Sequence, residues 1–215
     1  MTSFQDIALV ACGTVSLELN HLKQEGFLDT EHLKYTTPGL HEDPQELERQ
    51  LVQRIKQAKK SVDKVLVVYG GKFCYINVQE PTRSIDHVIQ EQGENITRIQ
   101  ATHCMDMVAS QKERDRIAQE MAGGEKVWWM VPGWIKFRHQ VFQGWDKGLA
   151  TENFPKHTGG AIVLDGIGYT EEFMAEKPEE FLDYSDWMGI PIQYYPVSLD
   201  RFKDLLLQGA ERLQG

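Results

Sequence analysis

The sequence is short of cysteine, of long apolar runs and of positive charge. Its three cysteines, an odd number in 215 residues, do not provide the paired set of a disulfide framework, which predicts reduced thiols in a reducing compartment. No eighteen consecutive residues are apolar, and the first residues lack a basic segment followed by an apolar one, so we expect a cytoplasmic protein with no membrane partner. With 23 basic and 32 acidic side chains and a net charge of −9, the sequence also argues against a nucleic-acid partner.

The apolar residues that are present suffice for one sizeable core. They make up 41% of the chain, and no linker rich in proline, glycine and serine divides it, so we expect a single α/β domain over residues 1–215. Short apolar runs alternate with longer segments of helical periodicity, which predicts an open, mostly parallel, Rossmann-like sheet of about six strands with helices on both faces. The predicted strands are Ile7–Ala11, Val65–Tyr69, Arg98–Ala101, Val127–Val131, Ala161–Leu164 and Ile192–Tyr195.

One helix start is marked clearly in the sequence. Asp43-Pro44-Gln45-Glu46 has the pattern of a capping box with proline in the first turn, and apolar residues follow it at helical spacing. Further predicted helices cover Val15–Gln24, Ser84–Gln92, Met105–Met121, Thr170–Lys177, Glu179–Met188 and Leu199–Leu213. The stretch Phe137–Gly160 has no clear period, and we expect a helix and then a loop over the site.

Each cysteine lies shortly after the end of a predicted strand. Cys12 follows the first strand, Cys74 the second and Cys104 the third. Because ligands of open parallel sheets bind at the carboxyl ends of the strands, this placement predicts one shared site. Three thiols with an imidazole, either His103 or His41, suit zinc, and thiolates also hold iron–sulfur clusters. We therefore predict a metal site at Cys12, Cys74 and Cys104, with His41 and His103 as further candidate ligands and the metal undecided.

Simple packing is the alternative for these thiols. Free cysteine is among the most frequently buried residue types and often serves as a small apolar side chain. The sequence has no Cys-x-x-Cys pair and no Cys/His cluster of the zinc-finger type, so a small structural zinc module is not indicated. An α/β domain with buried thiols and no metal therefore stays open.

Glycine-rich segments at the same strand ends predict a small-molecule pocket beside the thiols. Gly70-Gly71-Lys72 could approach an anion, but it lacks the spacing of a phosphate-binding loop, and a solvated Lys72 explains it equally well. Trp134, after a Pro-Gly pair, is the aromatic residue best suited to a pocket wall. The predicted pocket residues are Gly13, Gly70, Gly71, Lys72, Pro132, Gly133, Trp134 and Asp165, and the acid–base candidates are Glu18, Glu42, Asp106 and Asp165.

Five short motifs occur in order along the chain: Ala-Cys12-Gly, Pro38-Gly-Leu-His41, Tyr69-Gly70-Gly-Lys-Phe-Cys74, His103-Cys104-Met and Val131-Pro132-Gly133-Trp134. With these motifs the chain resembles, over nearly its whole length, the uncharacterised family DUF1638, whose members are often linked with corrinoid-dependent methyltransferase systems. The resemblance implies that Cys12, Cys74 and Cys104 are the functional set, accompanied by His41 and His103.

Together these observations favour a metal-binding protein that acts in or beside methyl-group transfer or corrinoid metabolism. Its expected partners are a methyltransferase or corrinoid protein and a small-molecule ligand, with a corrinoid as a further candidate cofactor. The alternative of a different class is a non-catalytic protein that delivers a corrinoid or a metal. The sequence does not decide whether the protein is an enzyme.

Overall fold

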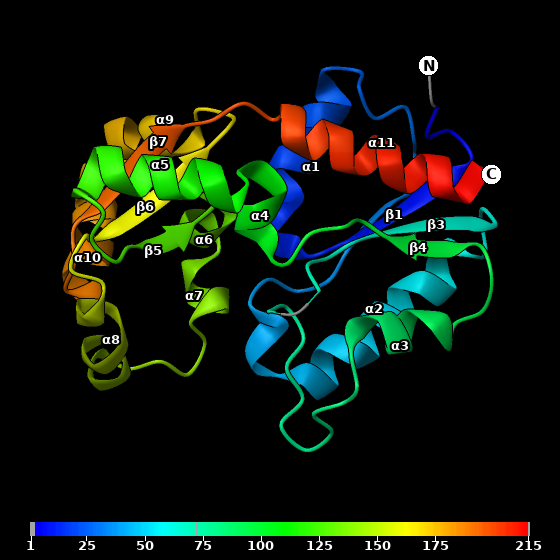
Figure 1. Ribbon diagram of the computed structural model, residues 1–215, viewed down its shortest axis with the longest axis horizontal. Helices are drawn as coiled ribbons and strands as arrows, with labels where there is room; N and C mark the ends of the chain where they lie inside the picture. Colours follow the sequence, from blue (N-terminus) through cyan, green and yellow to red (C-terminus); the bar gives the residue numbers. More distant parts are fainter. Residues whose placement is uncertain (1–2, 72, 215) are drawn as a thin grey trace.

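The computed structural model describes residues 3–71 and 73–214, which form two parallel sheets with helices around them (Figure 1). The first sheet has four strands in the order β2-β1-β3-β4, and the second has three in the order β5-β6-β7. The strands are β1 (Ile7–Ala11), β2 (Leu33–Tyr35), β3 (Lys64–Val68), β4 (Ile96–Arg98), β5 (Trp128–Met130), β6 (Ala161–Asp165) and β7 (Ile192–Pro196).

The central strands of both sheets are continuous apolar runs because they are covered on both faces. All five residues of β1 are buried, as are all five of β6 and four of the five in β3, as is usual for parallel strands between helical layers. In the first sheet Leu9 pairs with Leu33 on one side and Leu66 on the other. The prediction of an α/β fold with parallel strands and helices is therefore confirmed.

The expectation of one sheet of about six strands was wrong. Periodicity locates strands, but it does not say which strands pair, and the strands of this chain pair within two separate sheets. The break falls between β4 and β5, where the helices α4 (Cys104–Val108) and α5 (Gln111–Ala122) lead from one sheet to the other. The short edge strand β2 was missed because its three residues are only partly buried and carry no apolar run.

Local capping explains where several of the helices begin. Asp43 accepts a hydrogen bond from the backbone nitrogen of Glu46 at 3.0 Å, which confirms the predicted start of α2 (Pro44–Ala58). The predicted helix Met105–Met121 is instead split in two, because Ser110 and Glu113 form a capping box that starts α5 afresh. The remaining helices are α1 (Ser16–Gln24), α3 (Ile85–Gln90), α6 (Pro132–Lys136), α7 (Arg138–Val141), α8 (Lys147–Asn153), α9 (Tyr169–Glu176), α10 (Pro178–Met188), α11 (Asp200–Gln214) and the short 3-10 helices η1 (Gly13–Val15), η2 (Leu40–Glu42) and η3 (Phe154–Lys156).

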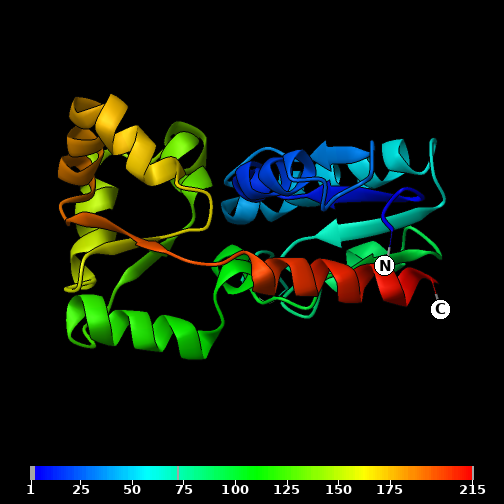
Figure 2. The ribbon, with the colours of Figure 1, turned by 90° about the horizontal axis from the view of Figure 1, so that it is seen from above.

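The two sheets form two lobes joined by a continuous apolar core. One cluster of buried residues includes Leu9 of β1, Leu66 of β3 and Val163 of β6, and so extends through both lobes. After β7 the chain crosses back, and α11 packs against β3, β4 and α4 of the first lobe (Figure 2). The prediction of a single domain over residues 1–215 is not tested by this arrangement and stays a prediction.

No helix in the described residues is long and apolar enough to cross a membrane.

Candidate functional site

The three cysteines line one small cavity where the carboxyl ends of β1 and β3 meet the second lobe. The cavity has a volume of about 30 Å³, enough for about one or two groups the size of water. Cys12 reaches it from the end of β1, Cys74 from the loop after β3, and Cys104 from the first turn of α4. Its other lining residues are Thr14, Leu40, His41, Leu47, Tyr69, Met107 and Trp134.

Two of the thiols have near neighbours beside the cavity. Cys12 Sγ lies 2.9 Å from Thr14 Oγ1, and Cys104 Sγ lies 3.0 Å from Met105 Sδ, toward which it donates. A protonated thiol can donate such a hydrogen bond, whereas a thiolate cannot. The site as described therefore fits neutral thiols whose sulfur atoms face polar or sulfur partners.

Burial governs the acidity of all three thiols. It raises the pKa of Cys12, and it raises the pKa of Cys74 to about 12, with the nearby Cys12 thiol adding to the effect. Burial also raises the pKa of Cys104 well above its usual value, and Cys74 and Cys12 raise it further. The N-terminal end of a helix, where Cys104 lies, favours the thiolate. The effect of burial is the larger one here, so the thiols are protonated at neutral pH.

Two glycines allow the backbones around the cavity to approach closely. A Cβ atom at Gly70 would lie 2.6 Å from Cys74 Sγ and 2.5 Å from the Cα of His103. A Cβ atom at Gly133 would lie only 1.9 Å from the carbonyl oxygen of Thr14. Gly133 therefore permits the contact between α6 and η1 that brings Trp134, from the second lobe, onto the thiol cavity.

The two candidate histidine ligands occupy different environments. His41 lines the cavity and stacks on Trp134 with ring centroids 5.6 Å apart, and burial lowers its pKa. His103 is not among the cavity-lining residues: its Nδ1 accepts a hydrogen bond from the backbone nitrogen of Asp106 at 3.1 Å and caps α4. Burial, helped by the Arg114 guanidinium, lowers the pKa of His103 to about 4. Both imidazoles are therefore neutral at pH 7.

Several predicted pocket residues shape the strand ends without lining the cavity. Gly13 and Gly71 each let the backbone come close to a neighbouring group. Gly13 faces Thr36 and Pro38, and Gly71 faces the Arg98 guanidinium. Pro132 starts α6. Asp165 accepts hydrogen bonds from the backbone nitrogens of Ile167 and Thr170 at 3.0 and 2.6 Å, and so orders the turn into α9. Lys72 lies outside the described residues.

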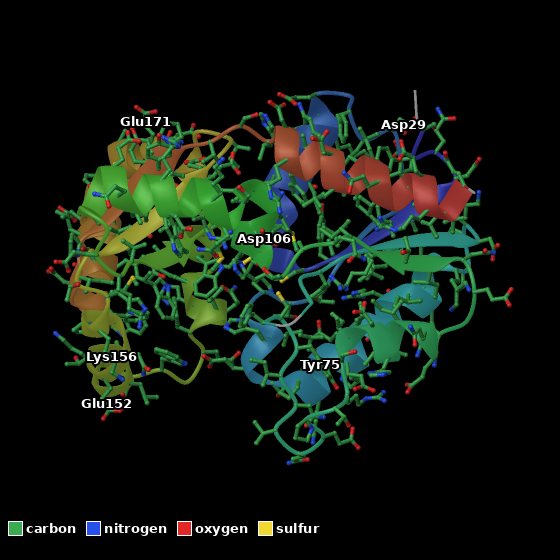
Figure 3. All side chains as sticks on the ribbon, in the orientation of Figure 1. Asp29, Tyr75, Asp106, Glu152, Lys156 and Glu171 are labelled. Carbon is green, nitrogen blue, oxygen red and sulfur yellow. The ribbon has the colours of Figure 1, made fainter. Side chains whose placement is uncertain are left out.

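The acid–base candidates also have identifiable surroundings. Asp106 lies near the middle of the molecule (Figure 3), where it bonds to Thr102 and to Arg201 of α11. Glu42 accepts a hydrogen bond from Trp145 Nε1 at 2.8 Å. Glu18 is completely buried, neither of its carboxyl oxygens has a hydrogen-bond partner in the described part of the chain, and burial raises its pKa to about 8, with Asp165 adding to the effect.

Sequence reasoning missed several members of the cavity wall. Tyr69 closes the end of β3, and its hydroxyl forms a short hydrogen bond with Thr36. Met107 comes from α4, one turn beyond Cys104. A signal for both was present, because each lies within five residues of a cysteine in the sequence. Leu40 and Leu47 come from segments whose approach to the thiols depends on tertiary packing.

The cavity wall also directs a hydrogen-bond donor at one of the thiols. Trp134 is 7% exposed, and its indole N–H interacts with the Cys104 thiol and lowers the pKa of that thiol, against the larger effect of burial. Among residues 3–71 and 73–214, no three His, Cys, Asp or Glu side chains are arranged as a ready-formed metal site.

The family model described as "Protein of unknown function (DUF1638)" matches residues 35–206. The chain belongs to this family. The match includes Cys74, Cys104, His41 and Trp134, whereas Cys12 precedes it. No curated protein and no solved structure matches the chain.

Proposed function

We propose that Cys12, Cys74 and Cys104 bind a single soft or borderline metal ion, with zinc as the first candidate. The observation that carries the proposal is that three thiols from three separate segments of the chain line one cavity of about 30 Å³. Thiolate sulfur is a preferred ligand of zinc, and a site with three protein ligands leaves one coordination position for an exogenous group. His41, a neutral imidazole in the same wall, supplies a further nitrogen donor.

The size of the cavity favours one ion over a cluster. A volume of about 30 Å³ holds about one or two water-sized groups, whereas the cubane form of an iron–sulfur cluster has eight core atoms. A cluster of that form would require the walls to move apart. Leu47, Tyr69 and Met107 are each less than 2% exposed, and such movement would disturb the packing of the core.

Binding of a metal ion at this site would release protons from the cysteine thiols. The thiols are neutral, and Cys12 and Cys104 face Thr14 and Met105. Each thiol that became a ligand would lose its proton and turn its sulfur into the cavity. The absence of a ready-formed ligand set in the described residues is consistent with that protonated state. A zinc ion held there would supply Lewis acidity to a bound thiol or water.

The place of this site in metabolism rests on the family resemblance. We infer a role in or beside methyl-group transfer or corrinoid metabolism, with a methyltransferase or corrinoid protein as partner, in the cytoplasm. Delivery of a metal or corrinoid without turnover is the second candidate. The small size of the cavity favours it, because a substrate larger than one or two water-sized groups would not fit among the thiols without movement of the walls.

The test is to purify the protein anaerobically and measure zinc, iron and acid-labile sulfide per chain. We expect about one zinc per chain and no sulfide. Cys74→Ala should lose the metal and lower stability together, because the ion stabilises only the folded state. Val65→Ala, at a buried position at the opposite end of β3, is the control: it should lower stability and retain zinc.

The alternatives give distinct results. Detection of iron together with acid-labile sulfide would show that the thiols hold an iron–sulfur cluster and not a single ion. A protein that takes up no zinc, even when refolded with it under reducing conditions, would leave three buried thiols that serve packing alone.

A further inference from the structure

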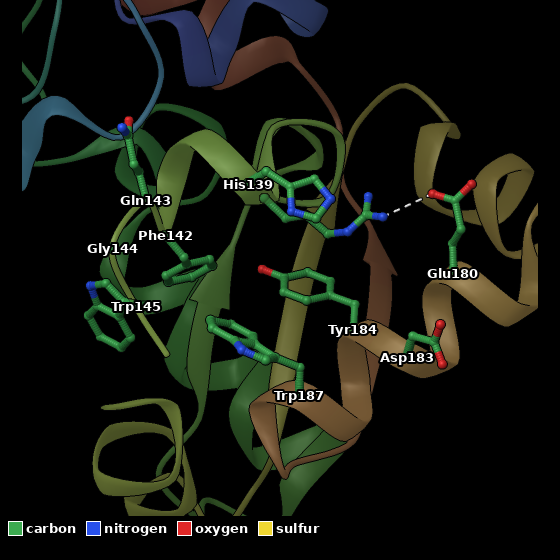
Figure 4. A pocket seen from close by; sticks show the side chains of 10 residues that line it. His139, Phe142, Gln143, Gly144, Trp145, Glu180, Asp183, Tyr184 and Trp187 are labelled. Atoms are coloured by element: carbon green, nitrogen blue, oxygen red, sulfur yellow. Dashed lines mark hydrogen bonds and ion pairs between the residues drawn. The ribbon is translucent and has the colours of Figure 1, made fainter. Parts of the chain in front are cut away.

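The second lobe contains an open cleft that the thiol site does not use. It has a volume of about 460 Å³, within the range of small-molecule sites. Four aromatic side chains line it, from α10 and from the segment after α7: Phe142, Trp145, Tyr184 and Trp187 (Figure 4). Arg138, His139, Gln143, Gly144, Glu180 and Asp183 complete the lining.

The aromatic rings form a cup and not a flat slot. The centroid of the Phe142 ring lies 5.2 Å from that of Trp187 and 5.4 Å from that of Trp145, with interplanar angles of 52° and 61°. Tyr184 is also inclined to Phe142, by 53°, while the rings of Tyr184 and Trp187 are nearly parallel, at 24° with centroids 6.0 Å apart. A planar ligand is best held between parallel faces, whereas inclined faces can each contact a different side of a rounded group.

One face of α10 supplies the acidic part of the cleft. Glu180, Asp183, Tyr184 and Trp187 follow at intervals of three, one and three residues, so they share a side of the helix. Glu180 is already paired, with Arg138 at 2.9 Å and Lys177 at 3.0 Å. Asp183 has no ion pair or hydrogen bond to any described residue. Its carboxylate is therefore available to a ligand.

Tyr184 contributes its ring to the wall of the cleft. The residue is 4% exposed, and its hydroxyl points to core atoms, with Trp134 O at 3.5 Å and Met130 Sδ at 3.9 Å. Neither Met130 nor Trp134 lines the cleft, so Asp183 is the acidic group there that is open to a ligand.

We propose that this cleft binds an organic cation with apolar substituents, such as a tertiary or quaternary ammonium compound. The faces of aromatic rings carry partial negative charge and attract such cations, and the attraction strengthens when the cation is desolvated. Asp183 supplies a full negative charge at the rim, while the charge of Arg138 is directed toward Glu180. The rounded shape of a substituted ammonium group matches the inclined rings. The proposal is independent of metal binding at the thiols.

The test compares three probes of nearly the same shape: choline, its uncharged carbon isostere dimethylbutanol, and the anion dimethylbutyrate. Binding is followed through the indole N–H signals of Trp145 and Trp187 in NMR spectra at constant ionic strength. Choline should bind with a Kd of about 1 mM or tighter. The alcohol should bind roughly tenfold more weakly and the anion more weakly still.

Two exposed aspartates on α10 provide matched variants. Asp183→Asn should weaken choline binding roughly three- to tenfold, whereas Asp186→Asn, three residues along the same helix and outside the cleft lining, should leave it unchanged. Trp187→Leu should weaken it further through loss of a ring.

Equal binding of choline and the alcohol would overturn the assignment to a cation, as would equal effects of the two aspartate variants. Tighter binding of dimethylbutyrate would assign the cleft to an anion through Arg138. If the indole signals did not change at tens of millimolar choline, the proposal of a ligand site in this cleft would be wrong. Metal content is unaffected in each case, so failure here is separable from failure of the thiol proposal.

Discussion

The thiol cavity and the aromatic cleft are separated by two aromatic side chains, Trp134 and Phe142. Trp134 lines the cavity, Phe142 lines the cleft, and their ring centroids are 5.5 Å apart. The cavity is the more closed of the two, about 30 Å³ in volume and rich in sulfur, whereas the cleft is the more open, about 460 Å³ in volume and edged with charge. A closed site selects its ligand by donor atoms, while an open one selects by shape and charge.

The comparison also separates two kinds of buried polar group. On the closed side the thiols and Glu18 are buried with few or no partners. On the open side the charged groups are paired or reach water. Changes on the closed side should therefore produce larger effects, and those on the open side smaller ones.

The largest expected effect is on metal affinity as a function of pH. The pKa of Cys74 is raised to about 12, and those of Cys12 and Cys104 are also raised, so below those values each thiol that becomes a ligand releases one proton. Zinc affinity should rise with pH by up to about a thousandfold per pH unit if all three thiols ligate. His41 adds no proton because its lowered pKa keeps it neutral.

Competition with a chromophoric chelator between about pH 6 and pH 8 measures that slope. Cys74→Ser should reduce it by about tenfold per pH unit, and Ser110→Ala, at a half-buried capping residue that does not line the cavity, should not change it. If zinc affinity did not change with pH, the thiols would not be metal ligands, and the cavity would be only a feature of core packing.

Glu18 should make stability fall as pH rises. Its pKa of about 8 in the folded protein, against an ordinary value of 4.5, means that the folded state holds a proton that the unfolded state has lost. The contribution of Glu18 to stability is therefore greatest below about pH 4.5, decreases between about 4.5 and 8, and is then level, with a total loss of roughly 3–5 kcal/mol from this group. Urea unfolding across this range measures the decrease.

Glu18→Gln should remove most of that pH dependence and stabilise the protein at pH 8 relative to the parent. Glu152→Gln, an exposed residue of α8 (Figure 3), is the control and should leave the pH profile unchanged. Parallel profiles for the parent and Glu18→Gln would show that Glu18 finds a partner or water when it ionises.

The closed and open sites differed in how much the sequence could predict. The cysteines and Trp134 were chosen because strand ends are readable from short apolar runs, and all four line the cavity. Their roles as ligands remain predictions. The cleft was not foreseen, because Phe142 and Trp145 lie in a stretch without clear periodicity and meet α10 only through tertiary packing.

For the fold as well, features set by neighbouring residues could be predicted from the sequence, whereas those set by tertiary packing could not. The start of α2 follows from Asp43 and Pro44, which act within one helical turn. Separation into two sheets depends on which strands pair. The close packing of α6 on η1 depends on Gly133, whose role can be seen only once tertiary packing places Thr14 against it.

Gly133→Ala tests that contact between the lobes. Its Cβ would lie 1.9 Å from Thr14 O, a backbone atom that cannot rotate away, so α6 and η1 must separate. We expect a loss of about 2–4 kcal/mol in the free energy of unfolding and greater access of thiol reagents to Cys12. Gly148→Ala, in the exposed helix α8, should instead be neutral or stabilise by up to about 1 kcal/mol. Unchanged thiol reactivity in Gly133→Ala would mean that this contact does not close the cavity.

The smallest effect is expected where the open cleft meets the first lobe. Trp145 Nε1 donates to Glu42 Oε2 at 2.8 Å, so Trp145→Phe removes a hydrogen bond to a charged acceptor at an exposed position and keeps an aromatic ring in the cleft. The free energy of unfolding should fall by about 0.5–1.5 kcal/mol. Glu42→Gln, which retains an acceptor oxygen, should cost less. Choline binding to the two tryptophan variants then shows which rings hold the ligand. If Trp145→Phe leaves it unchanged and Trp187→Leu weakens it, the ligand is held by Phe142, Tyr184 and Trp187, and Trp145 serves to join the lobes.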